Sequence, residues 1–501
     1  IELFILALST IDLSEELKVY KVVLFDCVAK GLEIQIAMIF DQQSILECLS
    51  LYEMFISSHY YLKYYEASIL FVNELCIKSA SVAIRNADIT CFLPLLTHGQ
   101  FLQNIPSMLG SIPFQRILSE RKNKFDNAIV VSAGPSLAKQ LSLLKAYQDK
   151  AVIFCADGAL SMLEKEGIIP DYVTNLDCRD LAMKFFQNKE NLKQSIIALE
   201  CATHPNVVRS LKAENCMIIL RNKALYQRFN LNDFGYIDTG THVSHFSYTL
   251  ALALGFKNII MIGQDLAFDE EGNSHSKGFS YGEKYEGGAN IDKFKIPAYA
   301  GKGEVLTHIA WNDYRIKLEY LFACNEQKAK FYNATEGGAR INFTEELSFK
   351  ECCEKLLTKE KPKFELPKSL TKNRSDKLLV KFKEKIQKDQ ENAKRFLDDA
   401  LALKQILENI LSKDFILPLE FLEKVYQNIE NFNHSLDTDE FIQDEVLRGA
   451  FAYRGKLISD VLKLHIKDET HFITAYIKAY HEWLLYFIEK LEQKYKSLSK
   501  V

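Results

Sequence analysis

The central part of the chain alternates short apolar runs with amphipathic segments of helical length. Such segments include residues 136–147 and 159–167. Continuous apolar runs separated by helices are typical of parallel strands that are covered on both faces. We therefore predict a doubly wound, largely parallel, Rossmann-like α/β sheet with strands at Ala128–Ser132, Ala151–Cys155, Asp171–Asn175, Ser195–Leu199, Cys216–Leu220 and Asn258–Ile262.

The last third of the chain has a different pattern. Its apolar residues follow the three-four spacing of an amphipathic helix, at Phe382, Ile386, Ala393, Phe396, Ala400, Leu403, Leu407 and Ile410. A basic linker precedes them, since residues 350–390 carry 13 Lys/Arg and 7 Asp/Glu. We predict an all-α bundle of four or five helices here.

The first part mixes short apolar runs, such as Val22–Cys27 and Ile34–Ile39, with longer amphipathic stretches. Either an incomplete α/β unit or a mostly helical domain fits this mixture. The expected domains are therefore 1–115, 116–345 and 346–501. A length of 501 residues agrees with about three domains.

Composition narrows the classes of function. The chain is 48% hydrophobic and 26% charged, as globular proteins are. Its 62 basic and 66 acidic side chains leave a net charge of -4, which gives no global electrostatic case for nucleic acid. Eleven cysteines without a CxxC pair indicate reduced thiols in the cytoplasm. No apolar run approaches the roughly 20 residues that span a bilayer, and no signal peptide is evident, so no membrane partner is expected.

The loop after the first predicted central strand is the first candidate site. In Ser132-Ala-Gly-Pro-Ser-Leu137, Gly134 permits a tight turn, and Pro135 and Ser136 open a helix. Backbone N–H groups and the Ser136 hydroxyl would then be free to hold an anion. The loop is neither a P-loop nor the six-residue dinucleotide fingerprint, and an N-capped turn without a ligand remains an alternative.

An aspartate follows each of three predicted strands, at Asp157, Asp177 and Asp265. The carboxyl ends of parallel strands meet at one edge of a sheet, where open α/β sheets bind their ligands. Carboxylates at that edge accept hydrogen bonds from a ribose diol or hold a divalent metal. A single aspartate after a strand is more commonly a helix cap or turn residue.

A second candidate phosphate site lies before the apolar helix predicted at Val243–Leu254. Thr239, Gly240 and Thr241 stand at its start, where helix N–H groups attract anions. His242 and His245 have a spacing that suggests zinc, but no Cys or carboxylate at matching spacing supports it. A structural role for both histidines is favoured.

The segment of about 45 residues after Asp265 is poor in β pattern and rich in Gly, Tyr and Lys, as a functional lid or a disordered loop is. It carries His275 in a polar setting, where histidine acts as an acid or base near neutral pH. A solvated loop histidine is the alternative. Further on, Asn333 and Thr335 follow another predicted strand, and their position suggests one more wall of the site.

In order and spacing these motifs resemble the motility-associated factor (Maf) family of bacterial flagellin glycosyltransferases. The matching pieces are Ser132–Leu137, Ala156–Gly158, Ile169–Asp171 with Asp177, Leu254–Ile260, Gly263–Leu266 and Asn333–Ala339. The same module is similar to bacterial sialyltransferases and to an archaeal pterin pyrophosphokinase group that shares the Maf-type domain.

The resemblance implies an O-glycosyltransferase that moves a pseudaminic, legionaminic or sialic-type nonulosonic acid from its CMP ester to Ser or Thr of flagellin, for flagellum assembly and motility. It implies no required cofactor, no metal, and two partners, the CMP-sugar and flagellin. His275 would be the base and Asp265 the second catalytic candidate. The residues expected to bind the donor are Ser132, Gly134, Pro135, Ser136, Asp157, Asp177, Thr239, Gly240, Thr241, Asn333 and Thr335.

Two alternatives stay open. One is a Mg²⁺-dependent pyrophosphokinase-type transferase, which clustered carboxylates would favour. The other is a non-catalytic chaperone that binds flagellin. The sequence also departs from the sialyltransferase pattern, because Phe268 stands near the position of the tyrosine that holds the leaving phosphate there.

Overall fold

The computed structural model describes residues 59–86, 90–186, 190–211, 213–286, 292–413, 415 and 417–500. They divide into two compact units. One contains residues 94–393 and 494–500, and the other contains the described residues up to Leu93 together with residues 394–493. These divisions differ from the boundaries expected at 115 and 345. The predicted runs at Val22–Cys27 and Ile34–Ile39 lie outside the described residues.

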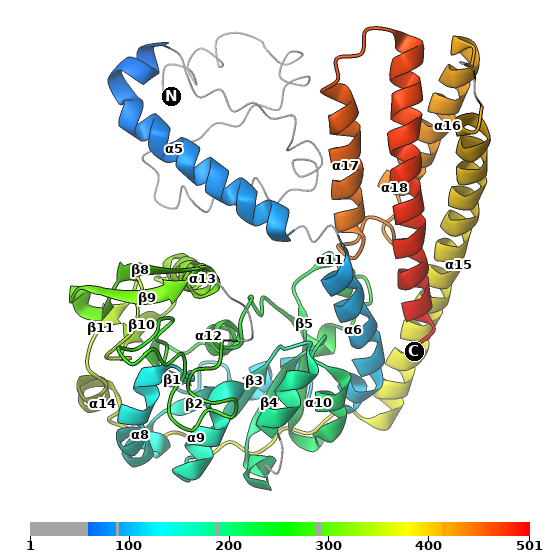
Figure 1. Ribbon diagram of the computed structural model, residues 1–501. Helices are drawn as coiled ribbons and strands as arrows, with labels where there is room; N and C mark the ends of the chain where they lie inside the picture. Colours follow the sequence, from blue (N-terminus) through cyan, green and yellow to red (C-terminus); the bar gives the residue numbers. More distant parts are fainter. Residues whose placement is uncertain are drawn as a thin grey trace, which may run out of the picture. The chain divides into compact units, whose positions relative to one another are not determined.

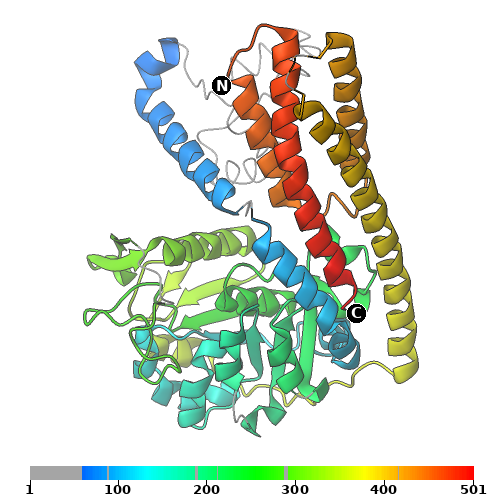
Figure 2. The same ribbon diagram turned by 45° about the vertical axis from the view of Figure 1, so that its right-hand side comes forward.

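The first unit is built on a nine-stranded sheet whose paired strands all run parallel (Figures 1 and 2). The order is β11-β10-β7-β1-β2-β3-β4-β5-β6. The strands are β1 (Asn127–Val131), β2 (Val152–Ala156), β3 (Tyr172–Asn175), β4 (Ile196–Glu200), β5 (Cys216–Arg221), β6 (Tyr236–Ile237), β7 (Asn258–Ile262), β10 (Lys330–Asn333) and β11 (Glu345–Glu346).

The burial of the central strands explains why their positions could be predicted from the sequence. Every residue of β1, β2, β3 and β4 is buried, and most of these residues are apolar, as is typical of parallel strands covered on both faces. The six strands predicted from the sequence are present, each within a residue or so of its expected bounds. The fold class is confirmed: a Rossmann-like, doubly wound α/β sheet.

Helices cover both faces of the sheet (Figure 1). On one face α7, α12 and α13 supply Phe114, Tyr248 and Phe322 to the main apolar core. The helices of this unit are α6 (Phe92–Gly110, from Pro94), α7 (Phe114–Arg121), α8 (Leu141–Tyr147), α9 (Leu160–Lys165), α10 (Pro205–Ser210), α11 (Ala224–Gln227), α12 (Val243–Ala253), α13 (Ile309–Asn325), α14 (Phe349–Leu356) and the first half of α15 (Lys372–Leu411).

Two expectations about local structure were wrong. The segment after Asp265 contains an antiparallel hairpin, β8 (Lys293–Pro297) and β9 (Glu304–His308), where no strand was predicted. Four of the five β8 residues are exposed, so its polar side chains gave no apolar run. The helix expected at 136–147 is interrupted: a 3₁₀ turn, η2 (Pro135–Lys139), comes before α8.

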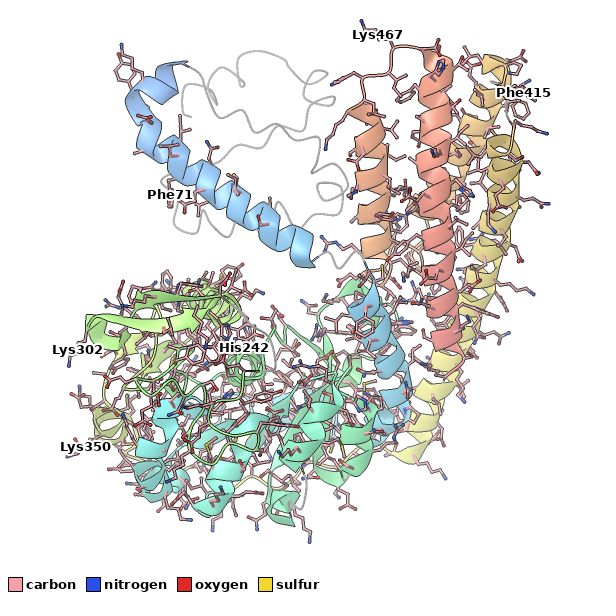
Figure 3. The ribbon with its side chains drawn as sticks, in the orientation of Figure 1. Phe71, His242, Lys302, Lys350, Phe415 and Lys467 are labelled. Atoms are coloured by element: carbon pink, nitrogen blue, oxygen red, sulfur yellow. The ribbon has the colours of Figure 1, made fainter. Side chains whose placement is uncertain are left out.

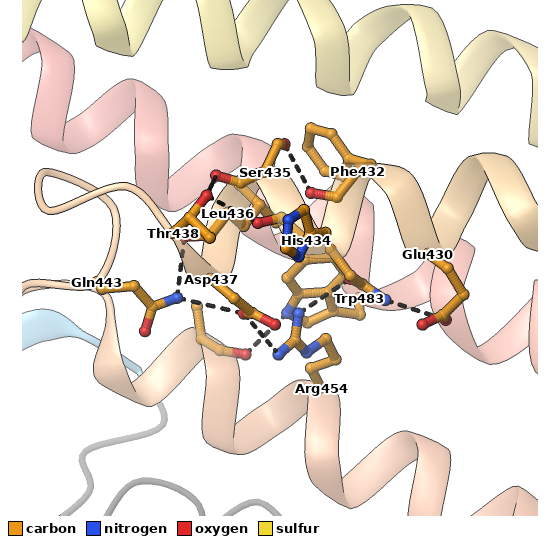
Figure 4. A network of polar contacts seen from close by, with 12 residues as sticks. Glu430, Phe432, His434, Ser435, Leu436, Asp437, Thr438, Gln443, Arg454 and Trp483 are labelled. Carbon is orange, nitrogen blue, oxygen red and sulfur yellow. Dashed lines mark hydrogen bonds and ion pairs between the residues drawn. The ribbon is translucent and has the colours of Figure 1, made fainter.

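The other unit is helical in its described residues, with α5 (His59–Asn86), the second half of α15, α16 (Leu419–Asp437), α17 (Arg448–Leu462) and most of α18 (Glu469–Leu498). The predicted C-terminal bundle is thus present. A polar network joins α16, α17 and α18 (Figure 4). Arg454 donates to Asn433 and lies 3.5 Å from Asp437, while Tyr480 donates to Asn433 at 2.8 Å. None of the described helices has an apolar stretch long enough to cross a bilayer.

Candidate functional site at the carboxyl edge of the sheet

Strand order places the candidate residues together. The strand β1 lies between β7 and β2, so the chain reverses its direction across the sheet here. Ligands of open α/β sheets bind at the carboxyl ends of strands beside such a switch point. Asp265, the Ser132–Ser136 loop, Asp157 and Asp177 follow β7, β1, β2 and β3, which are four neighbouring strands. The prediction that these residues share one edge is confirmed by the fold.

The donors of the first loop are already engaged. The Ser136 N–H lies 3.2 Å from Asp265 Oδ1, and the Ser136 hydroxyl donates to Asp265 Oδ2 at 2.8 Å. The sequence had suggested that these groups were free for an anion, and the structure corrects this: a carboxylate of the protein itself takes them. The loop therefore positions Asp265.

Two glycines allow the loop after β1 and the backbone at Gly338 to come close to Asp265. A Cβ on Gly134 would collide with Asp265 Oδ2 and with the carbonyl oxygen of Gly263, and a Cβ on Gly338 would collide with the Asp265 backbone. Only a residue without a side chain fits at either position. Asp265 is 4% exposed, and burial raises its pKa to about 7 although Ser136 favours the charged form.

Asp157, the first residue after β2, occupies a similar environment. Its Oδ1 accepts from the Gly158 N–H at 2.7 Å, and its Oδ2 accepts from Asn175 Nδ2 at 2.5 Å. Burial raises its pKa to about 7 as well. Asn175 Oδ1 is buried and has no hydrogen-bond partner among the described residues.

Asp177 forms an ion pair with Arg179. Oδ1 and Oδ2 of Asp177 lie 3.1 Å from Nε and Nη2 of Arg179, and Oδ1 also accepts from the Arg179 N–H at 2.9 Å. The hydrogen bonds with Asp177 raise the pKa of the guanidinium.

The turn before α12 is a second group of polar residues. His242, which is labelled in Figure 3, is the N-cap of α12. Its Nδ1 accepts from the His245 N–H. Gly240 has φ +67, and a Cβ there would collide with the His245 ring. Thr239 is fully buried, and its hydroxyl has no partner among the described residues. Thr241 stands between Gly240 and the N-cap residue.

The aspartates and histidines do not converge as metal ligands. Each aspartate bonds to an N–H or O–H group, and the pKa values of the buried His245 and the partly buried His242 are lowered by desolvation. Within the part of the chain that the structure describes, no three or more His, Cys, Asp and Glu side chains are placed to hold a metal ion. The structural role favoured for the two histidines agrees with their packing.

The segment that carries His275 packs on the first loop. Ser276 donates its N–H to the carbonyl oxygen of Ala133 at 2.9 Å, and its hydroxyl accepts from the Ala138 N–H at 3.1 Å. The His275 ring stacks on Phe279 at 3.9 Å, and its Nδ1 lies 2.9 Å from the Ser274 hydroxyl. Burial lowers the pKa of His275 to about 4, so the imidazole is neutral at pH 7.

Asn333 and Thr335 lie on the other side of β1. The Asn333 side chain accepts from the Thr335 N–H at 3.2 Å, while Asn333 Nδ2 and Thr335 Oγ1 are buried without a partner among the described residues. Gln140 donates to the carbonyl oxygens of Ala334 and Thr335, and its own Oε1 is also unpartnered. Unsatisfied buried polar atoms are uncommon and call for an explanation such as a ligand or a bound water.

Three residues of this edge were missed by the sequence analysis. Arg179 follows the predicted site residue Asp177 by two positions, and this short spacing could have indicated it as a site residue. Asn175 ends a predicted strand beside Asp157. The Tyr314 ring lies 4.6 Å from the His242 ring in a tilted arrangement, but Tyr314 belongs to α13, and no local pattern connected it to the site.

A separate hollow of about 530 Å³ lies beside α7, lined by Pro113, Arg116, Asp233 and Arg374 among others. Asp233 precedes β6 and α7 precedes β1, so this hollow is at the amino ends of the strands. Its Arg374–Asp233 ion pair has an arginine side chain that is 61% exposed. Chemistry and topology both favour the carboxyl edge as the functional site.

The fold is a Rossmann-like sheet with polar residues at its switch point, the place where open α/β sheets bind their ligands. A solved Maf glycosyltransferase from Magnetospirillum magneticum AMB-1 is similar over 93% of this chain and 68% of its own, with a TM-score of 0.51 and 17% identity. The predicted resemblance to the Maf family is thus confirmed at the level of the fold. Residues 99–271 match the family model described as 6-hydroxymethylpterin diphosphokinase MptE-like. No curated protein sequence matches the chain.

Proposed function

We propose that this protein is a cytoplasmic O-glycosyltransferase. It transfers a nonulosonic acid from its CMP ester to a Ser or Thr hydroxyl of flagellin, a modification that serves flagellum assembly and motility. The observation that carries the proposal is the set of buried, unpartnered polar atoms on both sides of β1, namely Thr239 Oγ1, Asn175 Oδ1, Asn333 Nδ2 and Thr335 Oγ1. A polar ligand at this edge would supply their missing partners. Similarity in fold to a Maf glycosyltransferase supports the reaction class.

The chemistry requires a base for the acceptor hydroxyl and stabilisation of the departing phosphate. His275 is neutral at pH 7 and belongs to the segment that packs on the first loop, so we assign it the base. It takes the hydroxyl proton as the oxygen attacks the anomeric carbon. The bond from that carbon to the phosphate oxygen then breaks, and CMP leaves with the electron pair. The Thr239–Thr241 turn at the start of α12 is the proposed phosphate contact.

Nucleotide binding by calorimetry tests the proposal, with Thr239→Val as the informative variant. Valine keeps the shape of threonine, and the Thr239 hydroxyl makes no hydrogen bond with the described residues, so the fold loses none of those contacts. We expect micromolar CMP binding in the wild type and about 10-fold weaker binding in the variant, the effect of one lost hydrogen bond to a charged group.

Thr249→Val is the matched control. Thr249 is also buried on α12, but its hydroxyl donates to the carbonyl oxygen of Phe246 in its own helix at 3.0 Å. Its substitution should leave CMP affinity unchanged. Equal CMP affinity in the wild type and Thr239→Val would remove Thr239 from the site. Flagellin binding without any nucleotide binding would favour the chaperone alternative.

The family model that matches residues 99–271 favours a second candidate, a diphosphokinase-type transferase. Its signature would be ADP binding that requires Mg²⁺ and is lost in Asp157→Asn, since this carboxylate is buried at the edge. CMP binding that is insensitive to EDTA would contradict this candidate.

A further inference from the structure

Arg179 is placed to receive an anionic group at the end of β3. Its side chain is 67% exposed, whereas that of Asp177 is 24% exposed. The Asp177–Arg179 backbone is anchored, because Gln100 on α6 donates to the carbonyl oxygen of Cys178 at 2.7 Å. The guanidinium therefore extends from a fixed segment.

One edge of this guanidinium remains open. Asp177 uses Nε and Nη2 in two parallel bonds of 3.1 Å. Nη1 has no hydrogen bond or ion pair in the part of the chain that the structure describes. A guanidinium has five N–H donors in a planar fork, so one carboxylate on the Nε edge leaves the Nη1–Nη2 edge for a second. The paired aspartate thus fixes the orientation of an open fork.

The surroundings connect this fork to the proposed site. The charge of Arg179 acts on the pKa of Tyr314, whose ring lies tilted against that of His242, the N-cap residue of α12. Tyr285 in turn acts on the pKa of Arg179, and its ring lies 6.3 Å from that of His275. The fork, the start of α12 and the candidate base therefore lie in the same region of the sheet edge.

Nearby positive charge offsets the aspartate. Lys184 lies 4.3 Å from the centre of the Tyr281 ring, and Tyr281 responds to the charges of Asp177 and Asp180. The two positive charges of Lys184 and Arg179 thus offset the two negative charges of these carboxylates.

We propose that Arg179 is a specificity-determining residue that binds the carboxylate of the donor sugar through its open Nη1–Nη2 edge, with Asp177 as its positioning residue. The inference rests on the proposed transfer of a nonulosonic acid, whose anomeric carbon bears a carboxylate. This contact of Arg179 selects sugars that carry a carboxylate over the neutral hexoses of most activated donors.

The test compares two ligands, CMP and CMP-N-acetylneuraminic acid, by calorimetry. The wild type should bind the CMP-sugar about 10- to 100-fold more tightly than CMP, as one bidentate charged contact gives. Arg179→Gln should abolish that difference and leave the CMP dissociation constant unchanged. Arg179→Lys keeps the charge without the fork and should recover only part of the difference.

Arg209→Gln is the matched control, because Arg209 is another exposed arginine of this unit that bonds a side chain, Asn206. It should change neither affinity. Equal wild-type affinity for the two ligands, or equal weakening of both by Arg179→Gln, would overturn the role of Arg179. Absence of CMP binding in the wild type is a different result: it would overturn the proposed function and this inference with it.

Discussion

At the scale of single residues, the site depends on a carboxyl group that is costly to ionise. Asp265 has an ordinary pKa of 3.8 that rises to about 7 in the fold. The unfolded chain therefore releases this proton before the folded chain does. The protonated Asp265 carboxyl stabilises the fold fully below about pH 4. This stabilisation is lost as the pH rises to about 7, and the free energy of unfolding then falls by up to about 4 kcal/mol.

Asp265→Asn should flatten this pH dependence. The asparagine oxygen can accept from the Ser136 N–H, and its amide can donate to the Ser136 oxygen. Denaturant unfolding at pH 5 and pH 8 should show a smaller loss of stability in the variant than in the wild type. Asp180→Asn, at an exposed aspartate, removes the same charge as a control. Parallel pH curves for the wild type and Asp265→Asn would contradict the prediction.

Gly134→Ala probes the same contact sterically. The added methyl group would collide with the Asp265 carboxyl and the Gly263 carbonyl oxygen, so we expect a loss of about 1–3 kcal/mol in the free energy of unfolding. Gly110→Ala is the control, since no heavy atom lies within 4 Å of its added methyl group. If Gly134→Ala has the same unfolding midpoint as the wild type, the loop accommodates the methyl group without loss of stability, and the prediction is wrong.

The sequence predicted site positions better than site contacts. Asp157, Asp177 and Asp265 could be placed at one edge because apolar runs mark where strands end. The contact between Ser136 and Asp265 joins residues 129 positions apart, and strand order determines it. Local patterns do not encode that order, so the occupied donors and the orientation of Arg179 were beyond prediction.

At the scale of elements, the helical unit contains a polar network. The three-four spacing of apolar residues, which predicted the helices, did not indicate this network. Glu430, Asn433 and Asp437 share one face of α16, and Asn433 donates to Glu430. Arg454 of α17 contacts Asn433 and Asp437 (Figure 4 labels Arg454 and Asp437), and Tyr480 of α18 donates to Asn433. Read from the sequence, these polar residues suggest a solvated face. The Arg454 side chain is only 12% exposed, and its guanidinium lies over the rings of Phe451 and Trp483.

Arg454→Ala should therefore destabilise the helical unit by about 2–3 kcal/mol, because it removes a charged hydrogen bond and ring contacts from a nearly buried position. Arg395→Ala is a matched control: that arginine also lies 3.5 Å from an aspartate, but its side chain is 58% exposed, so we expect about 1 kcal/mol or less. Thermal unfolding measures both. Equal shifts in melting temperature would contradict the special role of the network.

At the scale of the whole molecule, the fold was more predictable than the division into units. Buried parallel strands carry a strong signal, and the Rossmann-like sheet followed from it. The division was not visible because α15 and α18 each continue from one unit into the other without a break in their pattern.

The second of those helices has a consequence for synthesis. His98 on α6 is buried and lies 3.1 Å from the Ser497 hydroxyl, across 399 residues of chain. Lys494 is fully buried in the same unit. At roughly 5–20 residues per second, a ribosome needs about 20–80 s to make the intervening chain. All strands of the sheet unit are made before α18, but the unit completes its packing only when the end of α18 has been made.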